Sequence, residues 1–349
     1  MEYGGWRRSI DAGSTRMKIA VFSAQPYDRR FLDEEAGTVD AVQLVYYTEA
    51  LSLQSTALAQ GCEAVCVFVN DVLDAPVLDA LAQLGVRAVL LRCAGFNNLD
   101  TAAAARLGLF VARVPAYSPE AVAEHTLALI LTLNRNTHRA HARIREGNFA
   151  LDGLLGSNLH GKTVGIVGLG KIGMAAARIF KGFGCRVLGF DPAPPPQFSA
   201  LGELTAAAAL LPQADIVSLH CPLTPSTQHM IDAQALRAMK AGAMLVNTSR
   251  GALIDTSAVI DALKSRHLGA LAIDVYEQES ELFFQDRSAD IIGDDVFQRL
   301  LTFPNVLVTG HQGFFTIEAM REIAQTTFMN LACHVAGTAC VNAVPGTGK

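Results

Sequence analysis

The sequence has no excess of positive charge and no long apolar run. Its 349 residues hold 28 Lys and Arg against 33 Asp and Glu, a formal net charge of −5. Proteins that bind nucleic acid or an anionic membrane through charge carry a basic surface, which this composition does not offer. The apolar run 64–69 ends at Asn70 and Asp71, far short of the ~18 residues that cross a membrane. These absences predict a soluble protein with no nucleic-acid or membrane partner.

The seven cysteines show no pairing pattern. Their number is odd, they are scattered, and most lie in apolar segments such as 64–67. Cys62 and Cys66 are separated by three residues rather than two, and no second pair of ligands accompanies them, so a zinc site is not expected. We predict buried free thiols in a reducing compartment and no metal.

The first 17 residues lack the apolar core of a signal peptide. They contain paired glycines and paired arginines together with acidic residues, and we expect a disordered N-terminal extension over 1–17. An organellar transit peptide is the alternative. The predicted location is therefore the cytoplasm, or an organelle if this segment is such a leader.

Short apolar runs rich in β-branched residues alternate with helical stretches, which is the pattern of a parallel sheet with crossover helices. The runs are too many for one ordinary sheet, and at about 150 residues per domain the length also indicates two domains. The predicted fold class is therefore α/β with two parallel sheets. The predicted strands are 18–22, 42–46, 64–69, 88–92, 110–114, 163–167, 186–190, 215–219, 243–247, 268–274 and 306–309.

The passage between the domains is expected near the segment 114–120. Ser118 can cap, and Pro119 can open, a helix that runs through Leu133. Because its second half is apolar on nearly all sides, this helix should be buried on more than one side, with a subunit contact as one source of burial. A helix over 317–335 would carry the chain back to the first domain.

The strand 163–167 runs directly into Gly168-Leu-Gly170-Lys-Ile-Gly173 and a helical stretch. Glycines at this spacing allow a tight turn, close approach of the backbone to a diphosphate, and close packing of helix on strand. The next strand ends in Asp191, twenty-one residues after Gly170, where an acid binds the ribose hydroxyls of adenosine. A glycine turn that serves only packing is the alternative, but the context favours a dinucleotide cofactor.

Asp191 also indicates which dinucleotide binds. Its carboxylate would repel a 2′-phosphate, and the following Pro192-Ala193-Pro194 supplies no arginine to receive one. We therefore predict NAD(H) rather than NADP(H). The cofactor-binding residues expected in this region are Gly168, Gly170, Lys171, Ile172, Gly173 and Asp191.

Further motifs follow the glycine turn in order along the chain. They are His220-Cys-Pro-Leu-Thr224, Asn247-Thr-Ser-Arg-Gly-Ala252, Asp274-Val-Tyr-Glu277 and Gly310-His-Gln312. With these motifs the chain from 18 to 342 resembles the D-isomer-specific 2-hydroxyacid dehydrogenases. Within that family, the segments 92–98, 114–117 and 286–299 are most similar to the bacterial-type fermentative D-lactate dehydrogenases.

The resemblance implies two Rossmann-like domains, a flavodoxin-like substrate-binding domain being split in sequence around an NAD-binding domain. Residues 18–116 and 315–349 would form the substrate-binding domain, and residues 117–314 the NAD-binding domain. The implied reaction is reversible hydride transfer between NADH and the carbonyl carbon of a small 2-keto acid, pyruvate, which gives D-lactate. It would occur in a cleft that closes between the domains of a homodimer or homotetramer.

Three residues are implied as catalytic. Arg250 follows a strand end, and its planar guanidinium suits a carboxylate and a carbonyl oxygen together. His311, after another strand end, would be the proton donor, a task suited to a side chain that titrates near neutrality. Composition leaves its acidic partner open among Glu277, Glu279 and Glu281. The family spacing after the strand-end aspartate selects Glu279, which would favour the protonated ring.

The remaining site residues also come from the resemblance. Backbone amides at Gly95 and Phe96 would bind the substrate carboxylate, and Tyr117 and Phe314 would line the substrate pocket, with ordinary interdomain packing as the alternative role of these two rings. Further positions that touch the cofactor in relatives are Cys221, Pro222, Thr227, Thr248, Ser249 and Asp274.

Some features of the sequence leave other interpretations open. Gly313 stands where many relatives carry alanine, and Phe315 replaces smaller residues. One alternative is a reductase for a broader range of 2-keto acids, glyoxylate or hydroxypyruvate. Another, of a different class, is an NAD(H)-sensing corepressor-like protein that works by binding a partner. His220 and Cys221 are adjacent, but no further motif supports a thiol nucleophile.

Overall fold

The computed structural model describes residues 16–37 and 41–347. Its contacts divide the chain into two compact units: unit 1 holds the residues up to Ser118 and those from Thr316 onward, and unit 2 spans Pro119–Phe315. These divisions lie next to the expected ones, 116/117 and 314/315. The expected N-terminal extension lies outside the described residues as far as position 15. The first strand begins at Met17, which is the last residue of the expected extension.

Unit 1 is built on a five-stranded parallel sheet. Its strand order is β2-β1-β3-β4-β5, the order of flavodoxin-like folds, and that part of the fold prediction is confirmed. β3 and β4 are buried along their whole length, which explains why both are continuous apolar runs. The strands are β1 (Met17–Val21), β2 (Val42–Tyr46), β3 (Ala64–Val67), β4 (Ala88–Leu91) and β5 (Phe110–Arg113).

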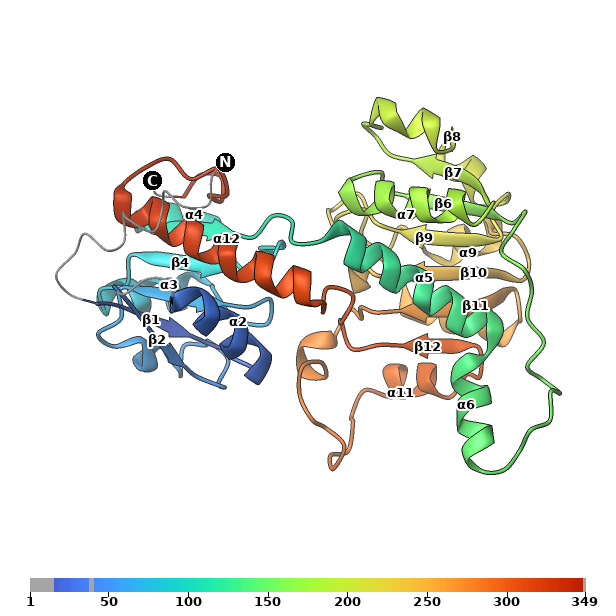
Figure 1. The fold of residues 1–349 in the computed structure, drawn as a ribbon, viewed down its shortest axis with the longest axis horizontal. Helices are drawn as coiled ribbons and strands as arrows, with labels where there is room; N and C mark the ends of the chain where they lie inside the picture. The colour runs from blue at the N-terminus through green and yellow to red at the C-terminus, as the bar shows by residue number, and fades with distance from the viewer. Residues whose placement is uncertain (1–15, 38–40, 348–349) are drawn as a thin grey trace. The chain divides into compact units, whose positions relative to one another are not determined.

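Helices cover both faces of this sheet (Figure 1). α3 (Ala75–Gln83) and α4 (Thr101–Arg106) share one apolar core with the strands. On the other face α2 (Pro26–Ala36) packs against α12 (Ile317–Ala336). The side chain of Thr316 accepts the Ala319 amide and caps α12, so this helix begins where the chain returns to unit 1. A 3₁₀ turn, η1, covers Thr56–Ala59.

Unit 2 contains a seven-stranded parallel sheet in the order β12-β11-β10-β9-β6-β7-β8. All its strands except β8 were predicted, most of them within a residue or so of their ends. β8 consists of two exposed residues at the sheet edge, so it carries no apolar pattern. The strands are β6 (Thr163–Val167), β7 (Arg186–Phe190), β8 (Glu203–Leu204), β9 (Ile216–Leu219), β10 (Ala243–Asn247), β11 (Leu268–Ile273) and β12 (Val306–Val308).

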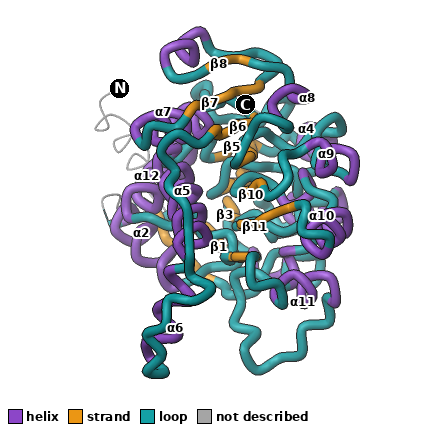
Figure 2. The backbone as a smooth tube through the Cα atoms, turned by 90° about the vertical axis from the view of Figure 1, so that its right-hand side faces the viewer, coloured by secondary structure: helices purple, strands orange, loops and turns teal. Residues whose placement is uncertain are grey.

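The helices of unit 2 also form two layers. Figure 2 shows α5 and α7 on one side of the strands and α9 and α10 on the other, and two separate apolar cores fill the spaces between. α6 was not predicted; it follows Asn136, whose φ is 51°, and buries none of its residues. The helices are α5 (Pro119–Arg135), α6 (Thr137–Arg145), α7 (Lys171–Gly182), α8 (Ala207–Leu210), α9 (Ala233–Ala238), α10 (Thr256–Lys264) and α11 (Asp295–Leu301), with 3₁₀ turns η2 (Pro196–Ala200), η3 (Gly251–Leu253) and η4 (Glu279–Glu281).

Two general predictions can be compared with the fold. Among the described residues, no helix has both the length and the apolar character needed to cross a membrane. All seven cysteines carry free thiols; five are buried, whereas Cys333 and Cys340 are partly exposed.

Candidate active site

The sequence motifs converge on one edge of the unit 2 sheet. Because its strands are all parallel, their carboxyl ends lie at the same edge. The chain leaves β6 toward β7 on one side, whereas β9 pairs with β6 on the other side. Ligands of open α/β sheets bind outside the carboxyl ends at such a switch point. The candidate residues of unit 2 follow β6, β7, β9, β10, β11 and β12.

Three glycines after β6 have the geometry that a diphosphate requires. Gly168 has a φ of 94°, and a Cβ there would lie 2.5 Å from the amide nitrogen of Cys221. A Cβ on Gly173 would collide with the carbonyl oxygen of Gly168. At Gly170, which precedes α7 without a side-chain cap, a Cβ would meet no heavy atom of the described residues within 4 Å. The amino end of α7 is therefore open to an anion, and these residues fit the diphosphate of NAD.

Asp191 stands beside this turn at the end of β7. Its Oδ2 accepts the amide of Leu169 at 2.7 Å, and its Oδ1 accepts the amide of Ala193 at 2.8 Å. These bonds fix the carboxylate at the glycine turn, and each oxygen keeps a lone pair with which it can accept a ribose hydroxyl. Lys171 and Ile172 form the first turn of α7, with the lysine exposed.

The loops after β9 and β10 are tied to each other. The Ser249 hydroxyl donates to the carbonyl oxygen of Cys221 at 2.7 Å. Within the loop after β9, the Thr227 hydroxyl donates to the carbonyl oxygen of Pro222 at 2.7 Å. Together with Thr248, these expected cofactor residues lie in two adjoining loops at the switch point.

Arg250 ends the segment that follows β10. The buried Asn247 donates from Nδ2 to the carbonyl oxygen of Arg250 at 2.8 Å, and its Oδ1 accepts the Ser249 amide at 3.0 Å. Within the described residues, the Arg250 guanidinium donates to the carbonyl oxygen of Ser249 at 2.7 Å. A guanidinium has five N–H donors, so this half-buried side chain retains donors for an anionic ligand.

His311, after β12, is paired with Glu279. Glu279 Oε1 lies 2.7 Å from His311 Nδ1, and Glu279 Oε2 accepts the amide of Tyr276 at 2.9 Å. The exposed fractions of the two side chains are 18% and 19%, so the pair is shielded but can be reached. Because Nδ1 faces the carboxylate, Nε2 is the ring nitrogen that can face a substrate.

The other glutamates of the acidic segment are placed differently. Both carboxylate oxygens of Glu277 lie 3.1 Å from Nε2 of His229. The side chain of Glu281 lies outside the described residues. Glu279, the residue that the family spacing selects, is the one that contacts His311.

Two phenylalanines flank the imidazole of His311. The Phe284 ring lies 5.7 Å from it between centroids, and the Phe314 ring lies 6.5 Å away in an edge-on arrangement. Phe314 was expected near the substrate, whereas Phe284 was not anticipated. Phe284 has a φ of 63°, a backbone conformation that the sequence does not predict for a phenylalanine. In the sequence, only the adjacent apolar pair Phe283-Phe284 could have pointed to Phe284 as a residue near the site.

Asp274 is the buried anchor of the segment that carries His311. Its carbonyl oxygen accepts the His311 amide at 2.7 Å, and its carboxylate accepts the amides of Gln312 at 2.9 Å and Gly313 at 2.8 Å. Burial alone would raise the pKa of this carboxyl group, but hydrogen bonds from His125 and other donors outweigh burial and lower the pKa. If Asp274 contacts the nicotinamide of the cofactor, it does so with a carboxylate that also holds the segment carrying His311.

His220 and Cys221 do not form a catalytic pair. His220 Nε2 lies 2.9 Å from the Ser218 hydroxyl, and its Nδ1 is buried with no hydrogen-bond partner in the described part of the chain. Burial lowers the pKa of His220 to about 4 and raises the pKa of Cys221 to about 11. At neutral pH the ring is uncharged and the thiol is protonated, which is the opposite of what a thiolate nucleophile requires.

Unit 1 carries three of the expected residues. Gly95 and Phe96 follow β4, and the half-buried Tyr117 lies just before the end of the first segment of this unit. Arg113, at the end of β5, donates to the carbonyl oxygen of Ala94 at 2.6 Å, and its guanidinium lies over the Phe96 ring, 5.2 Å from the centroid. Arg113 therefore holds the 94–96 loop at the carboxyl edge of the unit 1 sheet.

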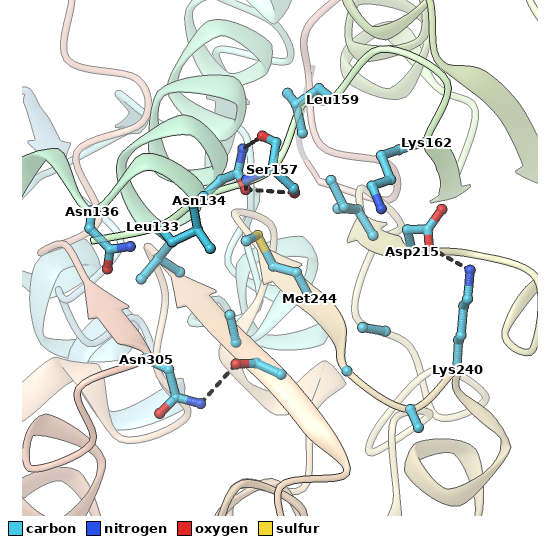
Figure 3. A pocket seen from close by; sticks show the side chains of 18 of the residues that line it. Leu133, Asn134, Asn136, Ser157, Leu159, Lys162, Asp215, Lys240, Met244 and Asn305 are labelled. Atoms are coloured by element: carbon cyan, nitrogen blue, oxygen red, sulfur yellow. Dashed lines mark hydrogen bonds and ion pairs between the residues drawn. The ribbon is translucent and has the colours of Figure 1, made fainter. Parts of the chain in front are cut away.

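A cavity of about 510 Å³ lies at the opposite edge of the unit 2 sheet, at the amino ends of the strands (Figure 3). Leu133 of α5 and Met244 of β10 line it, together with an ion pair between Asp215 and Lys240 at 2.6 Å. None of the expected catalytic or cofactor residues lines this cavity, so it is distinct from the site at the carboxyl edge.

Comparisons with known proteins identify the family of the chain. Residues 127–313 match the model of the D-isomer specific 2-hydroxyacid dehydrogenase, NAD binding domain. The chain is 56% identical to D-lactate dehydrogenase kk1H of Curvularia clavata, with 94% of this chain and 95% of the relative covered. It is 50% identical to the D-lactate dehydrogenase of Escherichia coli, with 93% and 99% covered. A solved structure titled as the pyruvate reductase of Chlamydomonas reinhardtii superposes with a TM-score of 0.90 at 42% identity, covering 96% of this chain and 100% of that one.

The chain therefore belongs to the D-isomer-specific 2-hydroxyacid dehydrogenase family. It is an oxidoreductase of 2-hydroxyacids, and the match to the NAD-binding domain of the family lies within unit 2. The predictions of family, fold class and NAD(H) are confirmed, and the corepressor-like interpretation is not needed to explain the chain.

Proposed function

We propose that this member of the family reduces pyruvate to D-lactate with NADH, in a reversible reaction. The observation that carries the proposal is the His311–Glu279 pair after β12 and β11, beside the Arg250 loop after β10. Reduction of a 2-keto acid needs a group that binds the carboxylate and a group that donates a proton, and we assign these tasks to Arg250 and His311. The relatives whose names specify D-lactate dehydrogenase and pyruvate reductase support pyruvate as the substrate.

Each catalytic side chain has a task that follows from its chemistry. Arg250 binds the substrate carboxylate and carbonyl oxygen through parallel N–H donors and makes the carbonyl carbon more electrophilic. His311 donates a proton from Nε2 to the carbonyl oxygen, and it takes the proton back when lactate is oxidised. Glu279 accepts from Nδ1, which holds the ring in place and stabilises its positive charge. NADH, when bound, supplies the hydride.

The same sheet edge would hold the cofactor. The glycine turn and the amino end of α7 bind the diphosphate, and Asp191 binds the adenosine ribose hydroxyls. The supporting observations are the open space at Gly170 and the fixed Asp191 carboxylate. The residues proposed to contact NAD(H) are Gly168, Gly170, Lys171, Ile172, Gly173, Asp191, Cys221, Pro222, Thr227, Thr248, Ser249 and Asp274.

Unit 1 is proposed to bind the substrate; the sequence alone indicated residues 18–116 and 315–349 for this domain. Its backbone amides at Gly95 and Phe96 would donate hydrogen bonds to the substrate carboxylate, and Tyr117 would line the pocket. Phe314 of unit 2, which is 7% exposed and edge-on to His311, would pack against the methyl group of pyruvate. A small apolar wall of this kind favours a short keto acid.

One assay tests the reaction. The decay of NADH absorbance is followed with pyruvate, glyoxylate, hydroxypyruvate and bulkier 2-keto acids, and the chirality of the product is determined. We expect the largest kcat/KM with pyruvate and a D-configured product. A larger kcat/KM with glyoxylate or hydroxypyruvate would favour the broader reductase, and no turnover of any acid would refute the enzymatic proposal for these substrates.

The chain is also proposed to form a homodimer or homotetramer. Three apolar side chains of the segment after α6 are largely exposed, Phe149 at 73%, Leu151 at 82% and Leu155 at 96%. Exposed apolar side chains clustered in one segment mark protein–protein contacts. Light scattering on the purified protein tests this: we expect a mass of two or four chains, and a lower mass for Leu151→Asp. A monomeric wild-type protein would contradict the proposal.

The seven free thiols support a reducing compartment, and we propose the cytoplasm. Fluorescence microscopy of the full chain carrying a C-terminal tag tests the location. Organellar fluorescence would instead favour a transit peptide in residues 1–17.

A further inference from the structure

Helix α5 contacts both catalytic loops of unit 2 with two consecutive residues, His125 and Thr126. It runs across the face of the sheet near β10, β11 and β12 (Figure 1). Neither residue belongs to a recognised motif of the site; Thr126 is fully buried, and the exposed fraction of the His125 side chain is 16%.

His125 reaches the segment that carries His311. Its Nε2 lies 3.2 Å from Asp274 Oδ1 and 3.1 Å from the hydroxyl oxygen of Thr309. The Thr309 hydroxyl itself donates to Asp274 Oδ1. A hydrogen on His125 Nε2 therefore points between two oxygens that belong to the ends of β11 and β12.

This contact matters because Asp274 alone links several backbone groups of the catalytic segment. The amides of His311, Gln312 and Gly313 all donate to Asp274. His311 has a φ of 53°, a conformation that a non-glycine residue keeps only when its surroundings fix it. The carbonyl oxygen of Asp274 accepts the His311 amide, and its carboxylate, which His125 contacts from α5, accepts the two amides that follow.

Thr126 reaches the segment that carries Arg250. Its hydroxyl donates to the carbonyl oxygen of Val122 at 2.8 Å, so the 2.9 Å contact with Thr248 leaves Thr126 as the acceptor and Thr248 as the donor. Thr248 lies in the short loop between Asn247 and Arg250 and is 8% exposed. The bond fixes the orientation of this loop from the same helix.

We propose that His125 and Thr126 are positioning residues for the two catalytic loops: His125 sets the place of His311 through Asp274, and Thr126 sets the place of Arg250 through Thr248. The inference rests on the proposed function, since it assigns these residues to the machinery of keto acid reduction. Loss of the His125 contact should impair proton donation, whereas loss of the Thr126 contact should weaken substrate binding.

The test for His125 compares three variants of the full-length protein with the wild type. Gln places an amide nitrogen close to the position of Nε2, whereas Asn is too short to reach Asp274 and Leu has no donor. We expect His125→Leu and His125→Asn to lower kcat about tenfold, the effect of losing one charge-assisted hydrogen bond at a catalytic segment, with the KM for pyruvate within about twofold of wild type. His125→Gln should recover most of kcat.

The test for Thr126 uses Thr126→Val, which keeps the shape and removes the acceptor, and Thr126→Ser, which keeps the acceptor. We expect Thr126→Val to raise the KM for pyruvate about fivefold with a smaller change in kcat, and Thr126→Ser to behave as wild type. The Kd of NADH, from fluorescence titration, should stay within about twofold of the wild-type value in all variants.

The outcomes separate the two claims. A wild-type protein that turns over no keto acid would overturn the proposed function and this inference with it. If the wild type is active, a His125→Leu protein with wild-type kcat, or a His125→Gln protein as slow as His125→Asn, would overturn the role of His125. Should the Leu variant fail to fold, the Gln and Asn pair decides. If the His125 and Thr126 variants all changed kcat and KM by the same factors, the cause would be a general loosening of the site. That result would overturn the positioning roles.

Discussion

Glu279 Oε1 lies 2.7 Å from His311 Nδ1, and the two side chains come from the loops after neighbouring strands of one parallel sheet. The sheet therefore brings together an acid and an imidazole that are 32 residues apart in sequence. The Tyr276 amide holds the second oxygen of the carboxylate, so the pair is fixed from both sides. This geometry leads to the first prediction.

We expect His311→Gln to lower kcat about 10²- to 10⁴-fold, because glutamine donates no proton to the carbonyl oxygen. Glu279→Gln should lower kcat about 10²-fold, since the amide keeps the shape but loses the negative charge beside the ring. Stopped-flow measurement of NADH oxidation checks both. The Kd of NADH serves as the control, and retention of wild-type kcat in His311→Gln would remove His311 from its role.

Arg250→Lys tests the bidentate contact. A lysine keeps the charge but presents a point charge rather than a planar fork, so we expect the KM for pyruvate to rise about tenfold or more. Steady-state kinetics over a wide pyruvate range measure the effect. Arg186→Lys, whose guanidinium pairs with Glu203 on the exposed surface, is a matched control for loss of a guanidinium, and an unaltered KM in Arg250→Lys would contradict the model.

Asp191→Ala tests the choice of cofactor. Removal of the carboxylate removes the repulsion of a 2′-phosphate, so we expect the ratio of kcat/KM with NADH to kcat/KM with NADPH to fall by about tenfold or more. Because Asp191 also accepts the Leu169 amide, the melting temperature of the variant is measured alongside. An unchanged ratio would show that the Asp191 carboxylate does not discriminate between a ribose 2′-hydroxyl and a 2′-phosphate.

His220 predicts a dependence of stability on pH. Its pKa is about 4 in the folded protein, against about 6.5 when unfolded. Between these two pH values His220 is protonated in the unfolded chain but not in the folded protein. The contribution of the neutral ring to the free energy of unfolding is therefore complete above pH 6.5 and decreases as the pH is lowered toward 4, by about 3 kcal/mol in total. Calorimetry of wild type and His220→Gln should show the wild type losing its advantage as the pH falls. A difference in melting temperature that is independent of pH would contradict this.

Gly168→Ala and Gly182→Ala form a matched pair at the two ends of the glycine turn and α7. At Gly168 an alanine would adopt a φ of 94° and press on the Cys221 backbone, so we expect a loss of about 1–3 kcal/mol and weak NADH binding. At Gly182, a helical position with open space in the described structure, an alanine should stabilise by about 0.5–1 kcal/mol. Thermal unfolding and NADH titration of both variants check the contrast.

The sequence predicted those parts of the fold that depend on local residue patterns. The strand–glycine–helix unit of β6 and α7 and the acid at the end of β7 depend on residues close in sequence, and so did most strand ends. β8 was missed because two exposed residues carry no periodicity, and α6 because its polar surface buries nothing.

The candidate site divides in the same way. Arg250 and His311 follow strand ends, which placed them at the carboxyl edge of the sheet, but their roles and the choice of Glu279 came from the family resemblance. His125 and Phe284 could not be found from the sequence, since each acts through a contact with residues far along the chain. The φ values of 53° at His311 and 63° at Phe284 are set by tertiary contacts rather than by local preference.

The absence of a side chain at Gly313 ties this position to His125. A Cβ at 313 would lie 3.0 Å from Asp274 Oδ2, which is a tight contact, and 3.4 Å from Cδ2 of His125, which is an ordinary one, so an alanine there presses on the carboxylate that His125 contacts. We therefore expect mutations at positions 125 and 313 to be epistatic, because both act on the position of the Asp274 carboxylate. Replacing only one of these two residues with its counterpart from a relative should therefore not have the effect that replacing both has.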